Sequence, residues 1–186
     1  MANIYTPLLN TPQEIRLLNL KPHFDNPLAA IKSRLEPANL WHAGAYTCLS
    51  YRWGDTTEMK SIFVDDKEFL VRRNLYDALK RLRLHDEPRR LWIDAICINQ
   101  DDTSERSAQV AVMQYIFQNA TDVIAWIGEE EGGSHGRPVT QRAANFVRES
   151  VTPPGWVGSP WVDLLALVER PWFSRIWIVQ EVAVAK

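Results

Sequence analysis

The sequence has few cysteines and no long apolar run. Its only two cysteines, Cys48 and Cys97, each lie inside an apolar, strand-like stretch. We therefore expect reduced core cysteines in a cytoplasmic protein, with neither a disulfide nor a metal site. No apolar run approaches the roughly 18 residues of a membrane span, and no secretory signal follows Met1. These absences predict a domain that does not associate with membranes.

The sequence also lacks a basic surplus and the common nucleotide-binding motifs. Its 21 Lys and Arg residues face 23 Asp and Glu residues, so the formal net charge is -2. A general binder of nucleic acids needs a basic surplus, so we expect no nucleic-acid partner. Neither a G-x-G-x-x-G turn nor a P-loop occurs, so neither site is predicted. The histidines are scattered in loops and suggest no catalytic triad: His23, His42, His85 and His135.

Apolar runs alternate with helical spacings along the middle of the chain. The runs that predict buried strands are residues 46–51, 91–98 and 122–128. The expected helices cover about 74–84 and the segment after Asp102, with an apolar stripe of Val110, Met113, Ile116, Phe117 and Ala120. This alternation predicts an α/β fold of three layers, in which a mostly parallel sheet is flanked by helices. Ligands of such folds bind beyond the carboxyl ends of the strands.

The remaining segments predict additions to this core within a single domain. Residues 1–40 carry five prolines and form an N-terminal extension with an edge strand over Ile15–Leu20. A β-hairpin is expected within 61–71, inside a core that spans 41–128. A loop and helical insertion over 129–170 precedes the final helix over 171–186. The extra helices are expected near residues 139–150, 160–169 and 172–185.

Glu181 is an acid in an otherwise apolar segment. Helical spacing places Ser174, Trp177 and Glu181 on one face of the expected last helix. A buried carboxylate must be paired, hydrogen-bonded or used in catalysis. One interpretation is a structural ion pair with Arg52, Arg106 or Arg175. The other is catalysis, because a carboxylate can stabilise a developing oxocarbenium ion where water is excluded.

A short polar turn comes after the first expected strand. In the functional interpretation, Gly54 lets a ligand approach the backbone and Arg52 contacts a phosphate, next to Ser50. In the other interpretation, the segment is an ordinary turn in which Asp55 caps the next residues of the chain. Residue types alone leave both open.

A second polar cluster comes after the next strand, and its residues are Asp94, Asn99, Gln100, Asp101 and Asp102. Their spacing is not that of an EF-hand, and no His or Cys completes a transition-metal set. We therefore interpret these residues as caps and turns rather than a metal site. For Glu105 we favour placement near the positive end of a helix dipole.

Four sequence blocks occur in order along the chain. They are Tyr46–Gly54 (YTCLSYRWG), Leu91–Gln100 (LWIDAICINQ), Glu105–Arg106 with Gln109–Val110 and Met113, and Arg170–Phe173 through Trp177 to Glu181. With Ile15–Leu18 and Asn74–Leu75, they resemble the HET, or heterokaryon incompatibility, domain of filamentous fungi over nearly the whole chain. HET domains usually head larger proteins that trigger cell death when genetically unlike hyphae fuse. Because the chain ends just after the last block, we expect a piece of a longer protein or a short family member.

HET domains are distantly similar to TIR domains, so the resemblance implies a flavodoxin-like, TIR-like fold. Some TIR domains cleave NAD+ into nicotinamide and ADP-ribose. Residues 49–55 resemble the first TIR box, and Trp177 precedes Glu181 as a tryptophan precedes the catalytic glutamate in TIR domains. The resemblance thus implies catalysis by Glu181 and substrate binding by Ser50, Arg52, Trp53, Gly54, Asp55, Asp94 and Trp177. The hairpin, the segment 129–170 and the bulky Trp53 depart from the TIR pattern.

Three functions are therefore expected as alternatives. The first is a cell-death-inducing NAD+ glycohydrolase that needs no cofactor and is activated by self-association. The second is a non-catalytic module that assembles with itself or with other proteins of an incompatibility system. The region between Trp156 and Trp161 motivates this second function, since exposed aromatic residues mark interfaces. The third is a nucleotide sensor without turnover.

Overall fold

The computed structural model describes residues 4–9, 12–129, 160–175 and Glu181, with the backbone alone for 160–163. The chain divides into two compact units, one of residues 1–126 and 177–186 and one of residues 127–176. The expected helix at 139–150, Trp156 and Trp177 lie outside the described residues, and so does the Trp161 side chain.

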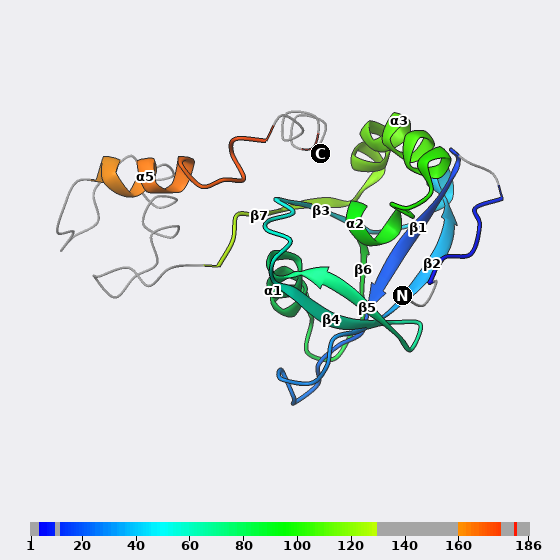
Figure 1. The fold of residues 1–186 in the computed structure, drawn as a ribbon, viewed down its shortest axis with the longest axis horizontal. Coiled ribbons are helices and arrows are strands. Elements are labelled where there is room, and N and C mark those ends of the chain that lie inside the picture. Colours follow the sequence, from blue (N-terminus) through cyan, green and yellow to red (C-terminus); the bar gives the residue numbers. More distant parts are fainter. Residues whose placement is uncertain (1–3, 10–11, 130–159, 176–180, 182–186) are drawn as a thin grey trace. The chain divides into compact units, whose positions relative to one another are not determined.

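A seven-stranded mixed sheet forms the centre of the first unit (Figure 1). The strand order is β5-β4-β2-β1-β6-β3-β7. The strands are β1 (Glu14–Leu20), β2 (Lys32–Asn39), β3 (Thr47–Tyr51), β4 (Met59–Val64), β5 (Lys67–Arg72), β6 (Arg89–Trp92) and β7 (Asp122–Trp126). β3 pairs in parallel with both β6 and β7, and β2 pairs in parallel with β4. The other pairings, which involve β1 and the hairpin, are antiparallel.

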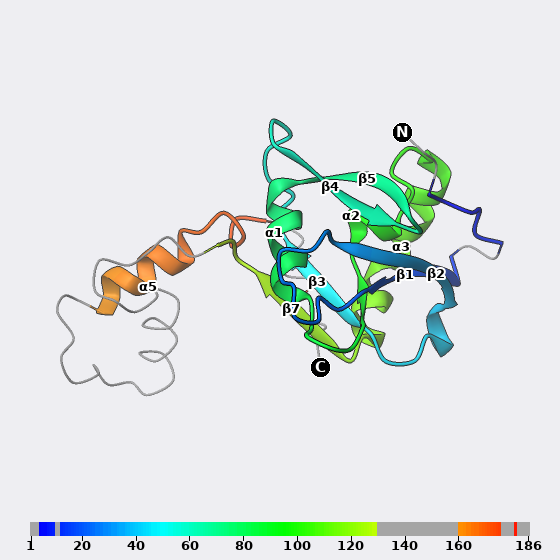
Figure 2. The same ribbon diagram turned by 90° about the horizontal axis from the view of Figure 1, so that it is seen from below.

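Helices cover both faces of this sheet. α1 (Arg73–Leu82) and α3 (Thr103–Asn119) lie on opposite faces (Figures 1 and 2). On the α3 face, the Tyr46 hydroxyl donates a hydrogen bond to the Ile116 carbonyl at 2.6 Å. The short helices are η1 (Leu40–His42) and α2 (Asp94–Cys97). The predicted α/β class, with a sheet between helical layers, is confirmed, and the parallel arrangement is concentrated in β6, β3 and β7.

The strand expected at the sheet edge lies in its interior. β1 pairs with β2 on one side and with β6 on the other. Its residues from Ile15 to Leu18 are all buried, so both of its faces are covered. The edge assignment was wrong because the surrounding prolines suggested an extension. Apolar residues at consecutive positions, such as Leu17 and Leu18, point to both faces of a strand and indicate that both are covered.

β2 was not predicted. Its sequence, KSRLEPAN, shows neither an apolar run nor a clean alternation, and it contains Pro37. Proline is confined to strand edges or ends, because it has no N–H to donate to a ladder. Pro37 lies opposite Arg16 in β1, beyond the two positions at which β2 pairs with β4. The proline is tolerated there because that part of β2 has one paired neighbour.

The expected second buried strand is shorter than predicted. β6 ends at Trp92, and Asp94 begins the short helix α2. Ile96, Cys97 and Ile98 are buried. A buried helical turn and a buried strand have the same apolar composition, so the run 91–98 could not separate them.

The α3 helix has the predicted start but a different apolar stripe. Met113, Ile116 and Phe117 are buried as expected, whereas Val110 is 39% exposed. Gln109 is buried in its place, and its Nε2 donates to the Glu14 carbonyl at 2.9 Å. A polar side chain thus occupies a core position because it binds a strand carbonyl.

The hairpin of β4 and β5 is confirmed. Val64 pairs with Lys67, and both residues between them, Asp65 and Asp66, have positive φ angles of 50° and 59°. A two-residue turn with this conformation matches the twist of antiparallel strands and favours Asp and Asn.

The second unit contains the predicted helix α5 (Pro160–Val168). Residues Pro171–Ser174 form a turn rather than the start of the last helix. The Ser174 hydroxyl donates to the Pro171 carbonyl at 2.9 Å within this turn. The predicted helical face that joins Ser174 to Glu181 is therefore wrong, because Ser174 belongs to this turn and not to a helix. Among the described residues, no helix is long and apolar enough to cross a membrane.

Candidate functional site

Ser50 and Glu181 meet inside the first unit. Ser50 is the fourth residue of β3, and its hydroxyl donates a hydrogen bond to Oε2 of Glu181, 131 residues later. Both side chains are buried, at 1% and 4% exposure. Ser50 and Glu181, which the TIR resemblance implies for one site, therefore lie in contact. A buried carboxyl group with a hydroxyl donor avoids much of the desolvation cost of burial.

Cys48 lies on the same face of β3, two residues before Ser50. Burial raises the pKa of its thiol well above the ordinary value, and the nearby Cys97 and Glu181 raise it further. A thiol with a raised pKa stays protonated at neutral pH and is a poor nucleophile. Cys48 is thus a core residue, as the sequence predicts, and both cysteines are outside disulfides.

The turn after β3 is held by the start of α1. The Arg52 carbonyl accepts a hydrogen bond from the Asn74 side chain. The Gly54 carbonyl accepts one from Nη1 of Arg72 at 2.7 Å. Asn74 in turn accepts from the indole N–H of Trp126 at 2.9 Å. The turn is therefore fixed by the start of α1, and Trp126 of β7 orients the Asn74 side chain that binds it.

Gly54 is required by the shape of this turn. Its φ of 77° lies in the left-handed region, which residues with a Cβ rarely adopt. A Cβ at this position would lie 3.3 Å from Cβ of Asn74. The group that approaches the glycine backbone is thus Asn74 of the same chain, and an approach by a ligand stays a prediction.

Asp55 has the capping role that was one of the two interpretations. Its carboxylate accepts a hydrogen bond from the Thr57 amide at 2.9 Å. Hydrogen bonds from the Thr57 amide and hydroxyl hold the pKa of Asp55 below its ordinary value. The side chain is exposed, so it stays ionised at neutral pH and can also meet a solute.

Trp53 joins the two polar tips of the sheet, which are residues 50–55, at the end of β3, and residues 94–102, after β6. Its indole N–H donates to Oδ2 of Asp94 at 2.8 Å, and the Arg72 guanidinium lies over its ring at 5.1 Å. Asp94 comes closely after β6, and β6 is the parallel neighbour of β3. The two tips therefore lie side by side, and the bulky Trp53 is the residue that bridges them.

The similarity to known proteins spans the same two parts of the site. The family model described as "Heterokaryon incompatibility protein (HET)" matches residues 46–181, from the start of the first motif to Glu181 itself. This chain belongs to the heterokaryon incompatibility family. The chain is 31% identical to "Heterokaryon incompatibility protein 6, OR allele" of Neurospora crassa, over 90% of its own length. The match covers 31% of that relative, so the chain spans about a third of it. No solved structure matches the chain.

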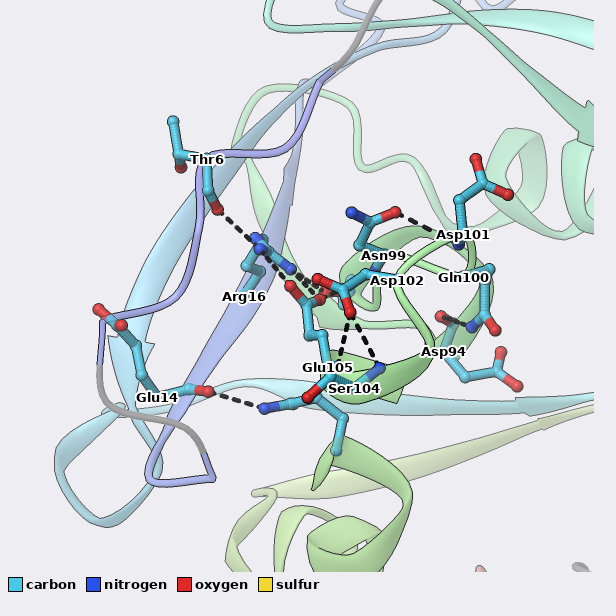
Figure 3. Close-up of polar contacts among 12 residues, drawn as sticks. Thr6, Glu14, Arg16, Asp94, Asn99, Gln100, Asp101, Asp102, Ser104 and Glu105 are labelled. Atoms are coloured by element: carbon cyan, nitrogen blue, oxygen red, sulfur yellow. Dashed lines mark hydrogen bonds and ion pairs between the residues drawn. The ribbon is translucent and has the colours of Figure 1, made fainter. Parts of the chain in front are cut away.

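In this HET domain the second polar tip is a set of caps and turns. The Asp102 carboxylate accepts hydrogen bonds from the amides of Ser104 and Glu105 at 2.9 and 3.0 Å (Figure 3). The Asn99 side chain accepts one from the Asp101 amide at 3.3 Å. These bonds confirm the predicted cap at the start of α3. Among the described residues, no group of three His, Cys, Asp or Glu side chains could hold a metal ion.

Sequence reasoning missed a buried ion pair behind this tip. Two guanidinium nitrogens of Arg16 donate to the two carboxylate oxygens of Glu105, at 2.6 and 2.9 Å (Figure 3). Arg16 also donates to the carbonyls of Thr6 and Cys97. The Asn99 amide donates to Glu105 at 2.8 Å. The pair therefore ties β1, the loop after α2 and α3 together, and the available signal was one arginine inside an apolar strand.

We expect the loss of one member of the Arg16–Glu105 pair to destabilise the fold strongly. Arg16→Met leaves a buried carboxylate without its partner and should lower the free energy of unfolding by about 3–5 kcal/mol. The double variant Arg16→Met, Glu105→Leu removes both charges and should recover part of this loss. Urea unfolding followed by tryptophan fluorescence measures both values. A double variant no more stable than Arg16→Met contradicts the role of the unpaired charge.

Gly54→Ala should destabilise the domain by about 1–2 kcal/mol, the usual cost of a left-handed residue with a Cβ, with a further loss from the contact with Asn74. Gly44→Ala is the matched control, because Gly44 has a φ of 71° but faces the end of the Arg90 side chain. Chemical denaturation of the two variants isolates the crowding at Asn74. Equal losses in both would show that this crowding contributes nothing.

Proposed function

We propose that this HET domain triggers cell death in fungal nonself recognition as an NAD+ glycohydrolase that is activated by self-association. The hydrogen bond between Ser50 and Glu181 carries the proposal. It supports a two-part site, in which the segment of Glu181 supplies an acid to the carboxyl end of β3. The end of a parallel strand is where ligands of α/β folds bind.

The proposed reaction breaks the bond between C1′ of the nicotinamide ribose and the pyridinium nitrogen. The electron pair of that bond leaves with neutral nicotinamide, and the ribose becomes an oxocarbenium ion. Glu181, as a carboxylate, stabilises this cation, and its effect is large because the residue is buried from water. Water then adds to C1′ and loses a proton to solvent, which yields ADP-ribose.

The residues around the pair have supporting roles in this proposal. Ser50, Arg52 and Gly54 line the nucleotide site, with Asp55 exposed at its rim. Trp53 holds Asp94 beside the turn through its indole N–H. Trp177, outside the described residues, packs near the ribose as the TIR resemblance implies.

The burial of the pair accounts for a need for activation. The Ser50 hydroxyl occupies one oxygen of Glu181, and both side chains are shielded from solvent. A ribose can reach Glu181 only after this contact opens. Self-association that shifts the final helix would open it, so the resting domain has little activity.

The test is nicotinamide release from NAD+ by the purified chain, alone and clustered on a multivalent scaffold. We expect release only on clustering, and a loss of about 100-fold or more in Glu181→Gln, the size of effect found when one stabilising group is removed. Glu87→Gln is the matched control, because Glu87 is exposed in a loop. Clustered wild type that is active and unaffected by Glu181→Gln removes Glu181 from the mechanism.

A non-catalytic module is the second candidate, and the same closed pair favours it. A carboxyl group satisfied by a buried hydroxyl also serves as a structural link between the final helix and β3. In that case Glu181→Gln lowers stability, and clustered wild type releases no nicotinamide. Calorimetry then separates a nucleotide sensor, which binds NAD+, from an assembly module, which does not.

A further inference from the structure

The outer surface of α3 carries no charged residue beyond the first turn of the helix. No charged residue occurs from Ser107 to Thr121, although charged residues make up 24% of the chain. The two charged residues of α3 lie in its first turn: Glu105 is buried and binds Arg16, and the exposed Arg106 donates to the Gln100 carbonyl at 3.1 Å. A solvent-facing helix usually carries charged residues on its outer face. This helix therefore presents an uncharged surface of unusual length.

A straight stripe runs along this outer surface. Its residues are Ser104, Ser107, Ala111, Tyr115 and Gln118, at spacings of three, four, four and three. These spacings keep all five on one helical face. The first four are exposed, and Gln118 is half-buried. The stripe is symmetric about Ala111, which is also the central residue of α3.

Tyr115 of the stripe pairs with a second exposed aromatic residue, Trp41. Trp41 of η1 is 53% exposed and Tyr115 is 46% exposed, and their ring centroids are 5.8 Å apart. Large exposed aromatic side chains are enriched at protein interfaces and supply much of their binding energy. Figures 1 and 2 show α3 on the face of the sheet opposite α1.

The stripe is complementary in size to its own copy. When two such helices pair antiparallel about Ala111, Ser107 of one lies opposite Tyr115 of the other, and Ser104 lies opposite Gln118. Small residues in the first half of the stripe thus meet large residues in the second half, which allows close packing. The Ser107 hydroxyl donates to the Thr103 carbonyl at 2.8 Å within its own helix, so its burial leaves no unpaired donor.

We propose that the stripe and Trp41 form the surface that binds a second copy of this chain about a two-fold axis through Ala111, with the two α3 helices antiparallel. In such an interface each residue near the axis faces itself, so a charge there would be repelled by its copy. The stripe has no charge, so no such repulsion arises. A surface without charge also has no electrostatic preference for a partner of opposite charge. The inference rests on the self-association in the proposed function and not on NAD+ turnover.

The test exploits the symmetry of the contact. Ala111→Glu and Ala111→Lys each place like charges opposite one another, and we expect each to weaken association by about tenfold or more. An equimolar mixture of the two variants should associate again, because Glu then faces Lys. Sedimentation velocity at rising protein concentration measures all three, and circular dichroism confirms that each variant is folded.

Val110→Glu is the matched control, because Val110 is exposed on the same helix but off the stripe. It should associate as the wild type does. Wild type that associates while both Ala111 variants remain unaffected overturns this surface and leaves self-association intact. Wild type that stays monomeric up to millimolar concentration overturns the surface and the proposed self-association together. Neither outcome depends on nicotinamide release, which is measured separately.

Discussion

Two buried acidic side chains link the separate segments of this domain to its sheet. Glu105 binds Arg16 of β1 through both carboxylate oxygens, and Glu181 accepts a hydrogen bond from Ser50 of β3. Burial of a carboxyl group is costly unless it is paired, so each acid is stable only beside its partner. The first contact positions α3 and the loop before it. The second brings the end of the HET motif region to the strand where that region begins.

The remaining contacts of the site depend on this frame. The carbonyls of the turn after β3 are bound by Arg72 and Asn74, which leaves Trp53 directed at Asp94. The two polar tips therefore form one connected unit beside the buried pair. Such a unit is preorganised. Cys48 and Ser50 share one face of β3, and the Cys48 thiol donates to the Ile116 carbonyl, so α3 and Glu181 lie on the same side of β3.

Much of the fold could be predicted from local patterns. Strand β3, the hairpin turn at Asp65 and Asp66, and the Asp102 cap depend on residues close in sequence, so composition and spacing reveal them. Local patterns gave the wrong result where a residue distant in sequence determines which side chain is buried or which strand forms. Gln109 is buried because a strand carbonyl needs a donor, and Val110 is exposed as a result. β2 carries no pattern of its own and is formed by its pairing with β1.

The sequence by itself determined that a polar turn lies at the start of the HET motif region and an acid at its end. Residue types and the order of motifs are properties of the sequence and do not depend on folding. The tertiary structure decided which atoms meet. The hydroxyl of Ser50 binds Glu181, and the guanidinium that pairs with a buried acid is that of Arg16, bound to Glu105. Pairing across 131 and 89 residues depends on strand order and on which groups are buried together. Local spacing in the sequence reveals neither the strand order nor which groups are buried together.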